Sequence, residues 1–169
     1  MKSPSCLLLA SVAMWMVALA APGHAQLRSL KAEVTPAVVK DQSVRAGAKV
    51  LVTLRVKLPE TVHVQSDKPR DRSLIPTALT IEPTAGVTVA KIVYPAATDL
   101  VQADLQQPLA VFGHDFTITV HLALAANITP GPLGVPARLR YQPCDETMCY
   151  PPARVDTRWT LDVAPPAAP

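Results

Sequence analysis

The stretch Phe116-Thr-Ile-Thr-Val-His-Leu-Ala-Leu124 alternates large apolar side chains with smaller or polar ones. Successive side chains of a β-strand point to opposite faces, so this period of two predicts a strand with one buried face. Arg154 to Val163 and Val50 to Leu58 show the same alternation. Shorter runs with this pattern lie at 78–81, 87–94 and 135–141.

Prolines and glycines separate these runs, as at Pro83-Thr-Ala-Gly86 and Pro130-Gly-Pro132. Proline breaks helices, and no segment after residue 25 has a convincing helical apolar period. Many short strands joined by turns predict an all-β fold, an immunoglobulin-like antiparallel β-sandwich. His63 to Pro76 and Pro95 to Pro108 are irregular, and we expect loops there. The small, proline-rich end, Ala164 to Pro169, is expected to be disordered.

The first 25 residues have the composition of a secretory signal peptide. Lys2 is the only charge before Arg28, and an apolar run from Cys6 to Ala21 leads to small residues before Ala25. A membrane anchor is the alternative, but the run is short for a span of about 20 residues and Pro22-Gly23 interrupt it. We expect cleavage after Ala25 and export. Removal of 25 of the 169 residues leaves 144, residues 26–169. This length is enough for one domain, which we expect at residues 26–163, and a domain of this size buries about 70% of its unfolded surface.

The charge of the chain argues against nucleic-acid binding. The formal net charge is +3 and includes one lysine of the predicted signal peptide, so the mature chain has +2. This small net charge does not indicate a nucleic-acid partner, and the sequence contains no block of basic residues. No second apolar stretch is long enough to span a membrane. We expect a soluble monomer without stable membrane insertion after signal cleavage.

Two cysteines remain after the predicted cleavage, in Cys144-Asp-Glu-Thr-Met-Cys149. One strand is expected to end at Tyr141 and another to begin after Pro152, which places the pair on the two stems of a hairpin loop. Opposed hairpin positions meet the Cα separation of about 4.4–6.8 Å that a disulfide needs. In an oxidising compartment, two such cysteines should not both remain thiols unless something keeps reducing them. A permanent disulfide, a cycling redox pair and a metal site are the alternatives.

The residues alone leave these alternatives open. A permanent bridge across so small a loop restricts the unfolded chain little, whereas exchange needs an attacking thiolate and a nearby resolving thiol. Asp145 and Glu146 disfavour a thiolate, so such a pair would depend on docking. A soft-metal site would need His63, His114 or His121 beside the thiolates. Their spacing does not force this, and solvated histidines are favoured.

The motif Tyr141-Gln-Pro-Cys144-x4-Cys149-Tyr-Pro-Pro152 resembles the signature of the amino-terminal periplasmic domain of the thiol:disulfide interchange protein DsbD. His63-Val-Gln-Ser-Asp-Lys-Pro69, Leu74-Ile-Pro-Thr77 and Ile92-Val-Tyr-Pro95 resemble other segments of that family, and the resemblance runs from about Val34 to Val163. It implies an immunoglobulin-like periplasmic domain with protein thiol-disulfide oxidoreductase activity of the reductase type. Such a domain takes electrons from a membrane-embedded thiol electron carrier and passes them to periplasmic thioredoxin-like proteins. No cofactor is implied, because the cysteines carry the electrons.

The same resemblance implies a role for each cysteine. Cys149 is the nucleophile that forms the mixed disulfide, Cys144 is the resolving thiol, and Tyr141 and Tyr150 pack around the pair. The full-length family protein continues into membrane helices and a thioredoxin-like domain. We therefore expect this chain to be a stand-alone exported domain that is reduced in trans. The competing prediction is a non-enzymatic periplasmic binding or assembly module with a structural Cys144–Cys149 disulfide.

In the family, an aromatic residue on a loop caps the oxidised pair. The corresponding stretch here runs from Tyr94 to Phe112 and has no aromatic residue between these two. We therefore expect Leu100, or another aliphatic residue, to shield the sulfurs, with Phe112 at the edge of the same stretch as a supporting residue.

Overall fold

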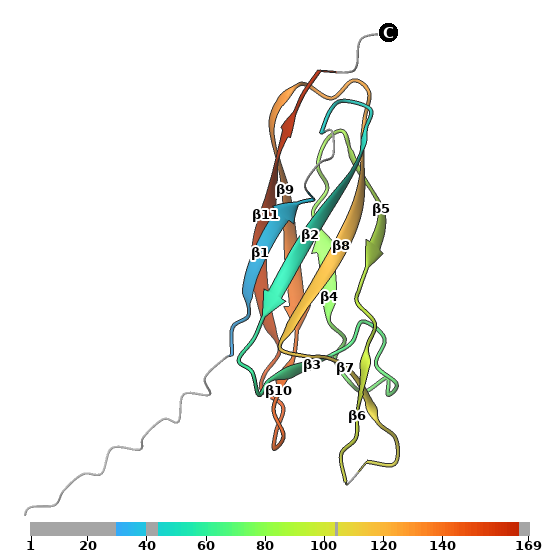
Figure 1. Ribbon diagram of the computed structural model, residues 1–169, viewed down its shortest axis with the longest axis vertical. Coiled ribbons are helices and arrows are strands. Elements are labelled where there is room, and N and C mark those ends of the chain that lie inside the picture. Colours follow the sequence, from blue (N-terminus) through green and yellow to red (C-terminus); the bar gives the residue numbers. More distant parts are fainter. Residues whose placement is uncertain (1–29, 40–43, 104, 166–169) are drawn as a thin grey trace, which may run out of the picture.

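The computed structural model describes residues 30–39, 44–103 and 105–165. The predicted signal peptide, residues 1–25, lies outside them. Over these ranges the chain is all β, and it contains no helix long and apolar enough to cross a membrane (Figure 1). The strands are β1 Glu33–Val38, β2 Lys49–Lys57, β3 His63–Gln65, β4 Ala78–Ile81, β5 Val87–Val93, β6 Thr98–Leu100, β7 Leu109–Phe112, β8 Asp115–Leu124, β9 Gly131–Tyr141, β10 Pro143–Cys144 and β11 Ala153–Val163.

Seven of these strands form the two layers of a sandwich. The order is β1-β2-β8-β5 in one sheet and β11-β9-β4 in the other, and every pairing is antiparallel. Taken in chain order, these strands reproduce the A-B-E-D and G-F-C sheets of an immunoglobulin constant-type domain. The predicted immunoglobulin-like β-sandwich is therefore confirmed.

Alternating side chains of both sheets fill the core. Along β2 and β8, buried residues alternate with more exposed ones, as the sequence pattern predicts. Trp159 on β11 is only 1% exposed, and its indole Nε1 donates a hydrogen bond of 2.7 Å to the carbonyl oxygen of Thr53 on β2. This bond joins the two sheets through the core, so the buried tryptophan is both packed and satisfied.

A third, small sheet, β10-β3-β7-β6, lies at one end of the sandwich. Its strands come from three connections, β2 to β4, β5 to β8 and β9 to β11, which all emerge at that end (Figure 1). The prediction of loops at His63 to Pro76 and Pro95 to Pro108 is therefore partly wrong, because His63–Gln65 and Thr98–Leu100 are strands. Strands of three residues are too short to show a period of two.

The long strands also differ at their ends from the prediction. β9 begins at Gly131 rather than near Val135, because Gly131 already pairs with Val163. Ala164, the first residue of the expected disordered tail, forms a parallel bridge with Arg45, and its amide donates to the carbonyl oxygen of Val44. Ordered pairing thus extends one residue beyond the predicted boundary at 163, and residues 166–169 lie outside the described part of the chain.

Candidate functional site

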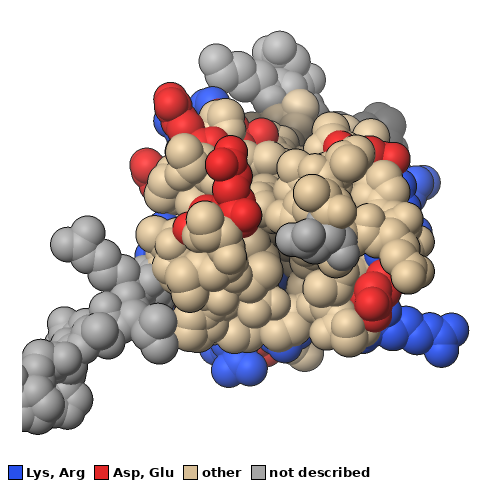
Figure 2. Space-filling model, turned by 90° about the horizontal axis from the view of Figure 1, so that it is seen from below, with Lys and Arg blue, Asp and Glu red and all other residues tan. Residues whose placement is uncertain are grey.

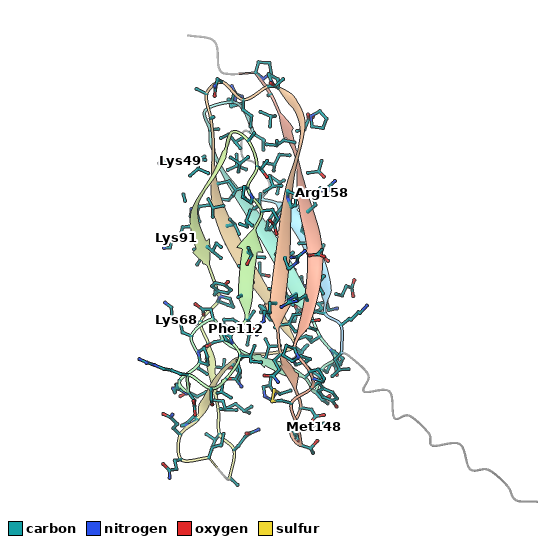
Figure 3. All side chains as sticks on the ribbon, turned by 180° about the vertical axis from the view of Figure 1, so that it is seen from behind. Lys49, Lys68, Lys91, Phe112, Met148 and Arg158 are labelled. Carbon is teal, nitrogen blue, oxygen red and sulfur yellow. A yellow bond between two sulfur atoms is a disulfide. The ribbon has the colours of Figure 1, made fainter. Side chains whose placement is uncertain are left out.

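The cysteines are joined in a disulfide at the tip of the β9–β11 hairpin. Cys144 ends β10 and Cys149 lies opposite it as an isolated antiparallel bridge. Their Cα atoms are 4.0 Å apart, slightly closer than the range expected from the sequence. Figure 3 shows the sulfur–sulfur bond close to Met148, at the end of the molecule that carries the small sheet.

Backbone hydrogen bonds on both sides of the cysteines explain this close approach. The amide of Tyr150 donates to the carbonyl oxygen of Pro143 at 2.8 Å, and the amide of Asp145 donates to that of Met148 at 2.9 Å. The cysteines between them therefore occupy a non-hydrogen-bonded pair, the antiparallel position in which opposed residues lie closest. Two main-chain hydrogen bonds thus flank the cysteine pair in addition to the sulfur–sulfur bond.

The Asp145 carboxylate organises the loop between the cysteines. Its Oδ1 accepts hydrogen bonds from the amides of Thr147 and Met148 and from the Thr147 hydroxyl, at 2.7–2.9 Å. Its Oδ2 accepts one from the Tyr150 hydroxyl at 2.6 Å. These donors, the Tyr150 hydroxyl foremost, hold the pKa of Asp145 far below its ordinary value, and the same bond raises the pKa of Tyr150. Tyr150, predicted to pack around the pair, thus contributes to the fold of the loop.

The two cysteines differ in exposure. Cys144 is 1% exposed, whereas Cys149 is exposed. An attacking thiolate from another protein can reach a sulfur only where the residue faces solvent, so the accessible half of this disulfide is Cys149. The exposure therefore agrees with the roles that the family resemblance implies for the two residues.

The disulfide lines an open hollow of about 850 Å³ between the hairpin and the connection from β6 to β7. Leu100, expected to shield the sulfurs, lies in its wall, together with three exposed apolar residues. These are Val101 at 77%, Leu105 at 44% and Met148 at 47% exposure, and we call the three the apolar rim. Val101 and Leu105 are not among the predicted site residues, although an aliphatic residue within a polar loop is a signal that could have indicated them.

Arg70 fixes the loop that carries Val101 and Leu105. Its guanidinium donates to the carbonyl oxygen of Pro108 at 2.6 Å and to the carboxylate of Asp99 at 2.5 Å. Asp99 lies in β6 and Pro108 directly precedes β7, so a single side chain holds both ends of the loop.

The charge of the hollow is negative. Glu60, Asp145 and Glu146 line it, and no lysine or arginine is among its described lining residues. Figure 2, which views this end of the molecule, shows Asp and Glu on the face and Lys and Arg mainly at its margin. Because burial and negative charge both disfavour a thiolate, Cys144 gains no electrostatic activation from these neighbours.

His63 lies beside the buried cysteine. It pairs directly with Cys144 in the β3–β10 register, it lines the hollow, and its Nε2 is buried with no hydrogen-bond partner among the described residues. Burial lowers the pKa of His63, partly offset by the charge of Asp145. The expectation of a solvated His63 is therefore wrong. His114 also lines the hollow, and His121 is partly exposed on β8.

Two other predicted supporting residues, Tyr141 and Phe112, lie in the core and do not line the hollow. The Tyr141 hydroxyl accepts a hydrogen bond from the amide of Ala32 at 2.5 Å and donates to the carbonyl oxygen of Leu30 at 3.2 Å. Phe112 stacks on Tyr94, with ring centroids 6.2 Å apart. Both residues support the strands that lead into the site without covering the sulfurs.

Comparison with known proteins identifies a sequence family and several solved structures that resemble this chain. Residues 32–159 match the family described as "Thiol:disulfide interchange protein DsbD, N-terminal". The DsbD N-terminal domain of Neisseria meningitidis, in its reduced form, is 19% identical with a TM-score of 0.43, over 69% of this chain and 80% of that one. The N-terminal periplasmic domain of ScsB from Proteus mirabilis is 14% identical with a TM-score of 0.46, over 78% and 46%.

A fimbrial protein is also among the matched solved structures. AggA, the major subunit of aggregative adherence fimbriae type I from Escherichia coli, is 10% identical with a TM-score of 0.34, over 79% of this chain and 96% of that one. No curated protein matches the sequence.

Proposed function

The chain belongs to the family of the N-terminal domain of the thiol:disulfide interchange protein DsbD, and from this membership we propose that it exchanges disulfides with other proteins through Cys144 and Cys149. The observation that supports this most is the unequal exposure of the pair, with Cys149 exposed and Cys144 buried beside an open hollow. Exchange needs one sulfur that a partner can reach and a second thiol within bonding distance that resolves the mixed disulfide.

The proposed reaction transfers two electrons in two steps. The thiolate of reduced Cys149 attacks the disulfide of a thioredoxin-like partner, forms a mixed disulfide, and releases the first partner sulfur as a thiolate. The thiol of Cys144 then loses its proton and attacks the Cys149 sulfur, which restores the Cys144–Cys149 bond and releases the second partner sulfur. In the opposite half of the cycle, a thiolate of a membrane-embedded electron carrier attacks the exposed Cys149 sulfur of the oxidised protein.

The apolar rim supports partner docking around Cys149. Val101, Leu105 and Met148 are among five large apolar residues that stand exposed in the described chain, and all three line the hollow of the disulfide. Apolar side chains grouped on one side of a protein mark interaction sites more often than scattered ones do. The partner surface should therefore be apolar around its own cysteines, with Lys or Arg near Glu60 and Glu146.

We propose the periplasm as the compartment, because an exchanging disulfide needs an oxidising environment and residues 1–25 have the composition of a signal peptide. The domain would then comprise residues 26–163. The test is fractionation of the producing bacterium followed by amino-terminal sequencing. Periplasmic protein beginning at Gln26 is expected, and a chain that stays in the cytoplasm with Met1 would contradict the proposal.

The decisive test of exchange is the reduction potential of the pair, measured by equilibration in dithiol buffers. A value between about −180 and −270 mV, the range of known exchange proteins, is expected. A value well below about −300 mV is typical of resistant structural disulfides and would rule out exchange. The remaining function would then be a binding or assembly module with a permanent bridge.

Trapping gives an independent test of the same proposal. Cys144→Ser removes the resolving thiol, so the mixed disulfide between Cys149 and a partner cannot be resolved. This variant should therefore accumulate mixed disulfides with partners in the cell. Cys149→Ser is the matched control, because it removes the exposed sulfur and should accumulate none. Equal trapping by both variants would contradict the assigned roles.

A further inference from the structure

One side chain next to the disulfide has no role in the exchange steps above. His63 opens β3 and faces Cys144 directly across the β3–β10 pairing. Side chains at directly opposed positions of an antiparallel pair lie on the same face, with Cβ atoms about 4.5–5.5 Å apart. Both residues line the hollow, so the imidazole is a neighbour of the buried sulfur.

The imidazole also has an unused nitrogen. Nε2 of His63 is buried and has no hydrogen-bond partner within the described ranges, which is unusual because buried polar atoms are nearly always paired. In the oxidised protein, Cys144 carries no proton to donate. In the reduced protein, or in the mixed disulfide, the Cys144 thiol supplies a donor in the same place.

The resolving step needs a proton acceptor at this position. Cys144 is 1% exposed, so water has little access to its thiol. The described residues of the hollow include three carboxylates and no Lys or Arg that could stabilise a thiolate. A neighbouring base that removes the proton as the sulfur attacks avoids forming an isolated buried thiolate.

We propose that His63 accepts the proton of the Cys144 thiol when this sulfur resolves the mixed disulfide. This inference rests on the proposed exchange function. The imidazole takes the proton, and the Cys144 sulfur attacks the Cys149 sulfur to form the intramolecular disulfide. The bond between Cys149 and the partner breaks, and the partner sulfur leaves with the electron pair. The proton then passes from the imidazolium to the partner thiolate or to water.

The electrostatic surroundings keep His63 available as a base. Burial lowers the pKa of its ring, so the neutral imidazole predominates at neutral pH. The titratable or charged groups of the hollow are Asp145 and Glu146 from the hairpin, Glu60 from the β2–β3 turn and His114 from the β7–β8 turn. The hydrogen bonds to Asp145 hold its pKa so low that its charge is constant wherever the imidazole titrates.

A two-phase assay separates the attack of the two cysteines. The reduced protein is mixed with the small aromatic disulfide dithiobis(nitrobenzoate), and release of the coloured thiolate is followed by stopped flow. The first equivalent reports the attack of Cys149, and the second reports resolution by Cys144. His63→Gln is expected to slow the second phase by at least about tenfold at pH 7 and to leave the first within about twofold. His121→Gln, which removes an imidazole on β8 outside the hollow, should change neither phase.

The pH profile distinguishes a base from a purely structural residue. In the wild type, the rate of the second phase should rise as the imidazole loses its proton and then level off. In His63→Gln it should rise about tenfold per pH unit with no plateau. A second phase unchanged by His63→Gln, or a wild-type rate that rises without a plateau through pH 8, would overturn the inference.

The same experiment separates this inference from the exchange proposal. If the first phase is normal and only the dependence on His63 is missing, the role of the histidine fails while exchange stands. If Cys149 releases no thiolate at all, the exchange proposal itself fails. The wild-type profile remains decisive even if His63→Gln folds poorly.

Discussion

The sandwich and the small sheet at its end are stabilised in different ways. β9 and β11 pair over eleven consecutive residues, from Gly131 opposite Val163 to Tyr141 opposite Ala153. In the small sheet, β10 pairs with β3 over two residues and β6 with β7 over three. The sandwich thus holds itself together through its core, and the small sheet depends on the sandwich. Val64 of β3 and Phe112 of β7 belong to the core, whereas the hairpin tip with the disulfide lies outside it. We infer that the hairpin tip can be changed with little effect on the stability of the sandwich.

The largest effect should come from the centre of the sandwich. Trp159→Ala removes a side chain that is 1% exposed and the hydrogen bond to Thr53 that joins the sheets. The free energy of unfolding should fall by about 3–5 kcal/mol, measured by denaturant titration. Trp159→Phe, which refills most of the cavity, is the control and should cost less. A loss below about 1 kcal/mol would show that the core does not dominate stability.

Reduction of the disulfide should have a smaller effect on stability. The bridge closes a loop with a sequence separation of five, so breaking it should lower the free energy of unfolding by at most about 2 kcal/mol. Denaturant titrations with and without dithiothreitol measure the difference, and Cys144→Ser with Cys149→Ser in one chain gives a reductant-free check. Unfolding upon reduction would mean that the bridge is a structural element of the sandwich.

A still smaller effect, confined to partner recognition, is expected at the apolar rim. Leu105→Ser and Met148→Ser remove exposed apolar surface beside the disulfide. Each should lower the rate of exchange with a thioredoxin-like partner by about twofold to tenfold at unchanged stability. Val89→Ser is the matched control, because Val89 is 39% exposed on β5 and does not line the hollow. If all three variants behave alike, the rim does not contact the partner.

The smallest change in global stability is expected at Asp145. Asp145→Ala removes the acceptor of four hydrogen bonds, so the amides of Thr147 and Met148 should exchange hydrogen faster while core amides keep their protection. Asp145→Asn, which keeps one acceptor oxygen, should give an intermediate result. Loss of protection throughout the sandwich would show that the loop and the core unfold together.

The pH dependence of this loop has a definite sign. The pKa of Asp145 is lower in the folded protein than its ordinary value of 3.8, mainly because Tyr150 and Thr147 donate to it. Its contribution to stability is therefore complete above that ordinary value and is lost only as the pH falls towards the lower folded pKa. Loop protection measured by hydrogen exchange should persist at pH 4, and a loss already between pH 6 and 5 would contradict this.

The sequence predicts the sandwich far better than the surroundings of the site. Phe116–Leu124 is long enough to show its alternation, and β8 covers Asp115–Leu124. The clear strand patterns on both sides of the two cysteines also predict their position on a hairpin, which the structure shows. The position of His63 opposite Cys144 is a pairing between residues far apart in the chain, which no local pattern encodes.

A local signal for one further residue was present in the sequence. Asp side chains often bond the amide two residues later, and Asp145 precedes Thr147 by two positions. That spacing predicts the organised loop, in addition to the negative charge that Asp145 brings to it. The position of Leu105 in the wall of the hollow could not be predicted, because it depends on the fold of the β6–β7 connection and on the pairing of strands too short to show a period of two.

The position of the cysteines between two backbone hydrogen bonds has a consequence for turnover. Those bonds, at Tyr150 with Pro143 and at Asp145 with Met148, involve no sulfur and can persist when the disulfide opens. The oxidised and reduced proteins should then present nearly the same outline. The electron donor and the electron acceptor would then compete for the same binding surface. No conformational change would release either of them, and the order in which they bind would depend on their concentrations and redox potentials.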